Sequence, residues 1–185
     1  MNQYRINEEL EIIGYLLKEP LTYGRKISKE LHIPLTTTQR VLHSLEKENI
    51  LESRQTGKNR MYTLKKNLIS KSYIVNAENY KIIKLVHAYP LLTPLWEDIL
   101  RKTPYTMVVL FGSYAKFIAK KNSDIDIFIE TQDLKVKQDI EALNSKLSVK
   151  IGLLNPKDLL TKEIIKNHVI LKGVERFYGQ LKFFE

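Results

Sequence analysis

The sequence has no cysteine among its 185 residues, and it has no apolar run that approaches the length of a membrane span. The absence of cysteine excludes disulfide bonds, thiolate zinc sites and thiol catalysis. A transmembrane helix needs about 20 consecutive apolar residues, so we expect no membrane partner. The opening stretch MNQYRINEELEII carries acidic residues where a signal peptide carries basic ones, and we therefore expect a cytoplasmic protein.

The composition is that of a globular chain with an excess of positive charge. A hydrophobic content of 43% predicts a packed core, and 185 residues suffice for one medium domain or two small ones. The formal net charge of +9 indicates an anionic partner, although a lysine-rich solvated surface is the alternative interpretation. One segment after Glu52 forms a local basic patch, whose basic residues are Arg54, Lys58, Arg60, Lys65 and Lys66.

Three amphipathic helices are predicted in the first fifty residues. Apolar residues recur at helical spacing over residues 8–18. The stretch YGRKISKELHI predicts a second helix, which ends before Pro34. Thr36 and Gln39 form the Thr-x-x-Gln pattern of a capping box, which predicts that a third helix starts near Thr37.

A basic hairpin is predicted after the third helix. The stretch NILESRQTGKNRMYTL alternates loosely and turns at TGKN, which indicates two short strands joined by a basic tip. The segments YGRKISKELHIPLTTTQRVLHSLEKENILES and GKNRMYTL resemble bacterial and archaeal winged-helix regulators, in which a hairpin follows three short helices. This resemblance covers about the first third of the chain. It implies double-stranded DNA as a partner and, because such regulators read paired half-sites, a homodimer.

The expected DNA contacts lie on the third helix and the hairpin. Side chains off the apolar stripe of the helix would enter the major groove, and basic residues of the hairpin would neutralise phosphates. The candidates are Thr37, Thr38, Arg40 and His43 on the helix and Lys58 and Arg60 on the hairpin. For Thr36 and Gln39 we favour helix capping, and for His43 an ordinary surface position is an equal alternative.

The middle of the chain predicts a connection between two domains. Residues 67–90 have apolar residues at helical spacing, which indicates a helical linker, with a dimer contact or cover for a neighbouring core as open alternatives. The stretch PLLTPLWEDILRKTP predicts a further helix in which Trp96 packs. We therefore assign residues 1–66 to a winged helix-turn-helix DNA-binding domain and residues 91–185 to a second domain.

A turn and two acids mark the second domain. The stretch YTMVVLFG predicts a buried strand, and Gly112 permits a tight turn into a helix that begins near Ser113. The free N–H groups of a helix start, together with the serine hydroxyl, are suited to bind phosphate. In the next strand, alternation places Asp124 and Asp126 on one face, about 6–7 Å apart. Such a pair is suited to Mg²⁺, which takes oxygen ligands and shares them with phosphates; a solvated strand end is the alternative for the acids alone.

The stretch GSYAKFIAKKNSDIDIFI, with NHVILKGVERFYG near the carboxyl end, resembles the nucleotidyltransferase superfamily that includes DNA polymerase beta, in particular its minimal nucleotidyltransferases. The resemblance covers about residues 91–179. It implies a mixed sheet flanked by helices, ATP or another nucleoside triphosphate as ligand, and metal-assisted attack of a hydroxyl on the α phosphate. The residues that it assigns to the triphosphate are Gly112, Ser113 and Lys116, and those that it assigns to the metal and to catalysis are Asp124 and Asp126.

The sequence departs from that family pattern at a third acid. Active members usually carry an aspartate on a later strand, where it completes the metal site. The matching segment is LSVKIGLLNPKDLL, which has Gly152 at the expected position and Lys150 as the nearest neighbour on the same face. Glu130 lies about 13 Å along its strand from the paired acids, and Asp158 is better placed to start a helix. We therefore expect a site that binds one metal and deprotonates a nucleophile poorly.

The sequence as a whole predicts an α+β chain, an N-terminal winged helix-turn-helix plus a C-terminal nucleotidyltransferase-fold mixed sheet flanked by helices. The expected function is a DNA-binding transcriptional regulator whose second domain binds Mg-nucleotide as a sensor or with weak activity. Two alternatives stay open. One is a nucleotidyltransferase that transfers NMP to a protein, nucleic acid or small molecule, and the other is an antitoxin-like module that acts on a partner protein.

Overall fold

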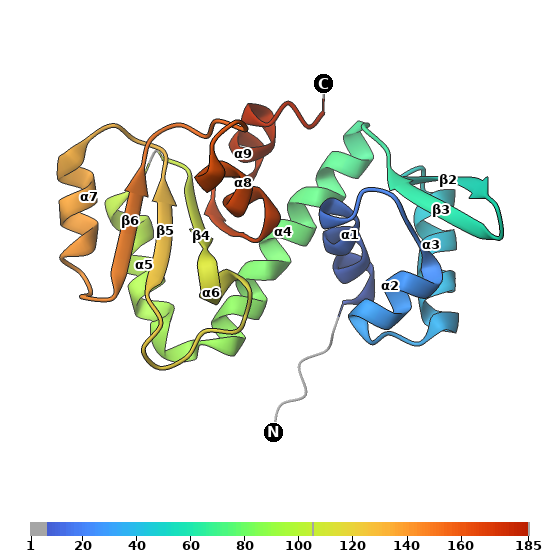
Figure 1. The fold of residues 1–185 in the computed structure, drawn as a ribbon, viewed down its shortest axis with the longest axis horizontal. Helices are drawn as coiled ribbons and strands as arrows, with labels where there is room; N and C mark the ends of the chain where they lie inside the picture. Colours follow the sequence, from blue (N-terminus) through green and yellow to red (C-terminus); the bar gives the residue numbers. More distant parts are fainter. Residues whose placement is uncertain (1–6, 105, 185) are drawn as a thin grey trace. The chain divides into compact units, whose positions relative to one another are not determined.

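The structure is a computed structural model that describes residues 7–104 and 106–184 (Figure 1). Its contacts form two compact units, which divide between Ala77 and Glu78. This division falls inside the long helix α4 (Leu68–Ala88), so the segment predicted as a linker contributes to both units. Each unit combines helices with a sheet, which confirms the α+β class. Within the described ranges, no helix is both long enough and apolar enough to cross a membrane.

The N-terminal unit consists of three helices and a small antiparallel sheet. The helices are α1 (Glu8–Lys18), α2 (Gly24–Leu31) and α3 (Leu35–Lys47), and the strands are β1 (Thr22–Tyr23), β2 (Leu51–Thr56) and β3 (Asn59–Leu64). The strand order is β1-β3-β2, so the hairpin of β2 and β3 gains a third strand that the sequence pattern did not indicate. The apolar stripes of the helices and the start of the hairpin form the core, whose fully buried members are Ile12, Ile13, Leu16, Ile27, Leu42, Leu45, Ile50 and Leu51.

The start of α3 differs from the prediction. The helix begins at Leu35, with Pro34 as its N-cap residue, two residues before Thr37. Thr36 therefore lies inside the first turn and is not the cap, so the predicted capping box is wrong. Proline fixes its own backbone and has no N–H group, which suits the residue that enters a helix. Thr38 lies three and four residues before Val41 and Leu42, so it shares their buried face. Its hydroxyl donates to the carbonyl oxygen of Pro34 at 3.1 Å.

The C-terminal unit is built on a four-stranded mixed sheet. Its strands are β4 (Val108–Phe111), β5 (Ile125–Ile129), β6 (Leu147–Ile151) and β7 (Val169–Lys172), in the order β6-β5-β4-β7. Strand β4 is antiparallel to both of its neighbours, whereas β5 and β6 are parallel. Its helices are the C-terminal part of α4, a 3₁₀ turn at Pro90–Leu92, α5 (Thr93–Lys102), α6 (Gly112–Ala115), α7 (Leu134–Glu141), α8 (Leu159–Lys166) and α9 (Val174–Gln180).

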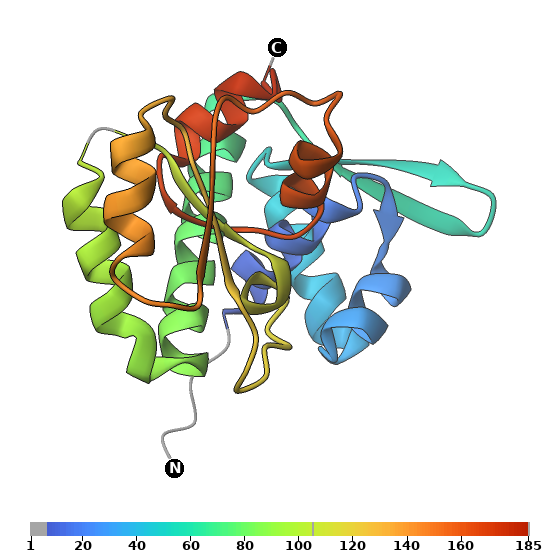
Figure 2. The same ribbon diagram turned by 60° about the vertical axis from the view of Figure 1, so that its left-hand side comes forward.

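The two faces of this sheet have different roles. One face carries the alternating apolar residues Ile125, Ile127 and Ile129 of β5, all fully buried. It packs against α5 and α7, which lie side by side on this face (Figure 2). Trp96 of α5 is 4% exposed and belongs to the same core, which confirms that it packs. Asp126 alternates with these isoleucines and therefore lies on the opposite face.

A buried polar cluster joins α4 to α9 within the C-terminal unit. The carboxylate of Glu78 has no exposed surface and accepts hydrogen bonds from Lys81 at 2.7 Å and Tyr178 at 2.6 Å. The imidazole Nε2 of His168 lies 3.4 Å from the same carboxylate. Burial by itself would raise the pKa of Glu78, but Lys81 and His168 hold that pKa at about 2. The cluster therefore stabilises the unit through an ionised buried glutamate.

We predict that Glu78→Gln lowers the free energy of unfolding of this unit by about 3–5 kcal/mol, because it leaves the amino group of Lys81 without its counter-ion. The folded-state pKa lies below the ordinary value of 4.5, so the glutamate's contribution is complete above pH 4.5 and is lost as the pH falls towards 2. Urea unfolding followed by the fluorescence of the single tryptophan, Trp96, measures this. Glu175→Gln, on the exposed surface of α9, is the control. An identical pH profile in wild type and Glu78→Gln would contradict the prediction.

Candidate functional site

The end of β4 brings a glycine against one of the paired acids. Phe111 pairs with Asp126 in the antiparallel ladder, so Gly112 follows directly beside that carboxylate. Gly112 has φ of 68°, in the left-handed region that favours glycine. A Cβ atom built on Gly112 would overlap the carboxylate of Asp126. The positive φ of the turn favours the predicted glycine, and a side chain there would displace the carboxylate of Asp126.

The turn continues into one short helical segment. Helix α6 spans Gly112–Ala115, so its start agrees with the prediction to within one residue. Tyr114 and Ala115 are buried in the core, whereas Ser113 is half-buried and Lys116 is exposed. Of the three residues predicted to contact the triphosphate, Ser113 and Lys116 are therefore accessible, whereas Gly112 is buried.

The paired acids sit at the start of β5. Asp124 is exposed just before the strand, and Asp126 is half-buried within it. Burial, and then the negative charges of Asp124 and Glu163, raise the pKa of Asp126, while Lys150 and Lys116 oppose the rise. A cation bound beside Asp126 would relieve the part of this rise that comes from the neighbouring negative charges.

Glu163 was missed by sequence reasoning. It lies on α8, exposed, with its Oε1 atom 3.6 Å from the Nζ atom of Lys116. It thereby places a carboxylate next to the residue predicted to bind the triphosphate. No local motif marks this residue, because it follows Asp126 by 37 positions and meets the site only through the packing of α8.

The register of β6 shows that Gly152 does not occupy the position expected for a third acid. Strands β5 and β6 are parallel and pair Asp126 with Ser148 and Phe128 with Lys150. Gly152 follows the end of β6, one residue after the pair Ile151 and Ile129, and lies roughly 13 Å along the strand from the level of Asp126. Gly152 is therefore not the neighbour of the paired acids. Ser148 holds that place, and Lys150 is the next residue on the same face.

Two other acids have structural roles. Glu130 is 5% exposed and is held by Arg176 and Gln180 of α9, in an ion pair and a hydrogen bond. Asp158 precedes α8 as its N-cap residue and accepts a hydrogen bond from Asn155 at 3.2 Å. These contacts account for Glu130 and Asp158 as structural residues, and neither acid is needed for the candidate site.

The donor set at the turn fits a magnesium ion that shares its ligands with phosphates. Within the part of the chain that the structure describes, no group of three or more acidic or histidine side chains is spaced to hold a metal. Asp124 and Asp126 offer carboxylate oxygens, which are the ligands that Mg²⁺ prefers, and Mg²⁺ usually completes its shell with water and substrate phosphates. The residues that would hold the ion are therefore these two aspartates.

The residues predicted to contact DNA differ in their exposure to solvent. Arg40 and His43 are exposed on α3, Thr37 is half-buried there, and Lys58 is exposed in the hairpin turn. Thr38 has no exposed surface, so its assignment to the DNA-facing side is wrong.

Arg60 is held by its own protein. One terminal nitrogen, Nη2, lies 2.7 Å from both carboxylate oxygens of Glu46 on α3, and Nε donates to the hydroxyl of Ser53 at 2.8 Å. The hydroxyl of Ser53 donates in turn to Glu46 at 2.6 Å. Sequence reasoning treated Arg60 as a free cation because Glu46 lies 14 residues away on a different element.

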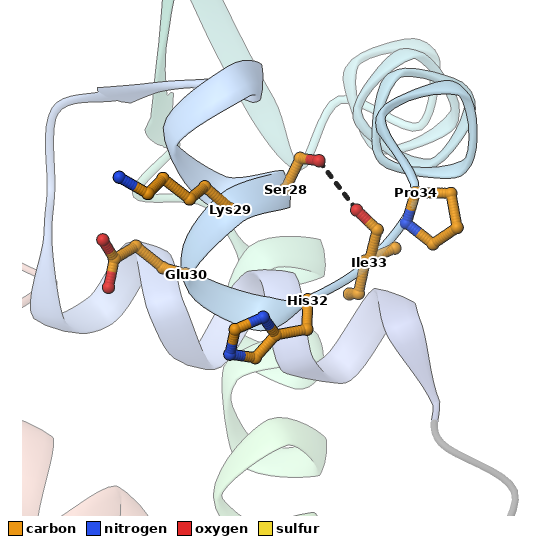
Figure 3. Close-up of a pocket in the computed structure, with 6 residues that line it drawn as sticks. All are labelled: Ser28, Lys29, Glu30, His32, Ile33 and Pro34. Carbon is orange, nitrogen blue, oxygen red and sulfur yellow. Dashed lines mark hydrogen bonds between the residues drawn. The ribbon is translucent and has the colours of Figure 1, made fainter.

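A hollow of about 640 Å³ lies at the turn between α2 and α3 (Figure 3). The turn is closed by the hydroxyl of Ser28, which donates to the carbonyl oxygen of Ile33 at 2.7 Å. The lining includes one cation and one acid, Lys29 and Glu30, whose side chains point away from that hydrogen bond. It contains none of the predicted site residues, and its opposite charges favour no particular ligand.

Residues 97–176, which run from α5 into α9, match the model of the family described as polymerase beta, nucleotidyltransferase. No curated protein matches the chain. The mixed sheet with its helices fits a nucleotidyltransferase fold, and the match supports a nucleotidyltransferase-like function at the level of the family. The matched residues include Gly112, Asp124 and Asp126.

Proposed function

We propose that the chain is a DNA-binding transcriptional regulator whose nucleotidyltransferase-like domain binds a nucleoside triphosphate with Mg²⁺. The observation that carries the nucleotide part is the close approach of Gly112 to the carboxylate of Asp126, inside the segment that matches the family model. Nucleotidyltransferase domains typically use these two ligands.

The nucleotide would be held by residues on either side of that approach. Asp124 and Asp126 would hold the metal ion, and Ser113 and Lys116 would donate to the phosphate oxygens. Bound Mg²⁺ neutralises phosphate charge and polarises the α phosphate. Lys116 would exchange its partner, the carboxylate of Glu163, for a phosphate.

Binding without efficient turnover is favoured by the neighbours of the two acids. Ser148 and Lys150 occupy the adjacent positions on β6, and neither is an acid that could take a proton from an attacking hydroxyl at neutral pH. A positioned general base contributes about 10²–10⁴-fold to such a step. The alternative, transfer of NMP to an acceptor, is favoured by the family match itself.

The DNA-binding part is proposed from the N-terminal unit. Three helices followed by a hairpin, with α3 preceding it directly, are the order of elements of a winged helix-turn-helix. Arg40 and His43 on α3 and Lys58 in the hairpin turn are exposed, as a reading helix and a phosphate-binding hairpin require. Two copies in a symmetric dimer would place two such units on paired half-sites.

We predict that Asp124→Asn and Asp126→Asn each weaken magnesium-dependent ATP binding by at least about tenfold while the fold persists. Loss of even an indirect metal partner costs about 10–100-fold in metal affinity, so loss of a direct carboxylate ligand should cost at least about tenfold. Calorimetric titration with ATP, in the presence of Mg²⁺ or of EDTA, measures the change. Asp139→Asn, an exposed acid on α7, is the matched control and should bind as wild type does. Wild-type affinity in both site variants would show that these acids are ordinary surface residues.

We further predict that wild type binds ATP but releases pyrophosphate slowly, and that Ser148→Asp raises the rate. The substitution places a carboxylate about 4.8 Å across the sheet from Asp126, where it can accept a proton. Ser148→Asn is the uncharged control, and circular dichroism verifies that both variants fold. Rapid release of pyrophosphate by wild type would contradict the sensor assignment and favour the transferase.

A further inference from the structure

The N-terminal unit has a groove of about 430 Å³ between the start of α2, α3 and the hairpin, which we call the hairpin groove. We propose that the hairpin groove binds a backbone phosphate of duplex DNA through Arg25 and Lys58, while Glu46 keeps Arg60 from acting as a phosphate ligand. This inference rests on the proposed DNA-binding function and identifies the residues that perform it. Arg25 was not among the residues expected from the sequence.

The charge of the lining indicates an anionic ligand. The groove is lined by Tyr23, Gly24, Arg25, Leu35, Gln39, Leu42, Lys58, Asn59, Arg60 and Tyr62. Three of these residues are cations and none is acidic. Gln39 and Asn59 add neutral amide groups, which can donate to phosphate oxygens. A small anion with several oxygen acceptors is the ligand that this combination fits.

The shape of the groove is set by a glycine and a leucine. Leu42 is fully buried in the core, and a Cβ atom on Gly24 would lie 3.2 Å from its Cδ1 atom. The backbone of α2 therefore begins against the core, and Arg25 is the first residue with a long side chain. The first turn of α2 has no acidic residue and no side-chain cap, so no built-in anion offsets the positive end of the helix.

The three cations of the groove are not equivalent. Arg25 and Lys58 are exposed, and neither forms an ion pair within the described ranges of the chain. Arg60 instead makes its two short contacts with Glu46 and is fixed further by Ser53. A phosphate near Arg60 would meet the negative charge of Glu46 as well, so the pair contributes little net attraction.

The groove also lies where a DNA strand would pass. Gln39 comes one residue before Arg40 on α3, and Lys58 lies at the turn of the hairpin. A duplex that contacts both the helix and the hairpin must carry its backbone past the space between them. The phosphate in the hairpin groove is therefore assigned to DNA, and a free nucleotide is the other source of the same chemistry.

The test is the salt dependence of DNA binding by the full chain, measured by fluorescence anisotropy with a labelled duplex. Each phosphate contact contributes about 0.9 to the slope of log K against log salt concentration, which corresponds to roughly eightfold in affinity at 0.1 M salt. Arg25→Gln and Lys58→Gln should each reduce the magnitude of this negative slope by about 0.9. The double variant Glu46→Gln with Arg60→Gln, which removes both charges of the pair, should leave the magnitude of the slope unchanged. Glu46→Gln alone should raise that magnitude by about 0.9, because it frees the charge of Arg60.

Lys29→Gln is the matched control, because it removes the same charge from the same helix but lines the hollow of Figure 3 and not the groove. If Arg25→Gln behaves as Lys29→Gln does, the groove is not a phosphate site, even though the wild type binds DNA. If the wild type does not bind DNA at all, the proposed function fails first. A free nucleotide is tested with the Asp126→Asn variant. If this variant does not bind DNA but still binds ATP, and if adding Arg25→Gln removes that ATP binding, the ligand of the groove is a free nucleotide and the assignment to DNA is wrong.

Discussion

The close contact between Gly112 and the carboxylate of Asp126 is the constraint on which the C-terminal site depends. Antiparallel pairing of β4 and β5 sets these two residues side by side, and a side chain at Gly112 would displace the carboxylate of Asp126. The same glycine has the positive φ that ends β4 and begins α6. One backbone position therefore determines where the acid points and where Ser113 and Lys116 emerge from the core.

Charge decides what each unit is equipped to bind. In the C-terminal unit, the acids at 124, 126 and 163 lie near the cations Lys116 and Lys150. Burial, and then the charges of the neighbouring acids, raise the pKa of Asp126. A bound metal ion would pair with the acids, and its phosphates would pair with the lysines. In the N-terminal unit, the ion pair of Glu46 with Arg60 removes one cation from the hairpin and leaves others exposed. In both units, an internal ion pair involves a residue expected to bind phosphate.

The sequence predicted what depends on neighbouring residues and failed where distant residues meet. Helix α1, the hairpin turn and the glycine before Ser113 follow from periodicity and turn chemistry, which are local. The start of α3 was misplaced because Thr36 and Gln39 imitate a capping box, while Pro34 provides the true helix entry. The place of Gly152 was wrong because it depends on the parallel register of β6 against β5. Glu163 could not be found, since only tertiary packing brings α8 to the site.

A crystal structure of the protein with Mg²⁺ and ATP would test whether the turn at Gly112 is a nucleotide site. We expect electron density for the metal ion between the carboxylates of Asp124 and Asp126. We also expect a triphosphate that contacts Ser113 and Lys116, with Lys116 released from Glu163. Ordered ATP bound elsewhere, or a metal ion held without either aspartate, would contradict the assignment of this turn as the nucleotide site.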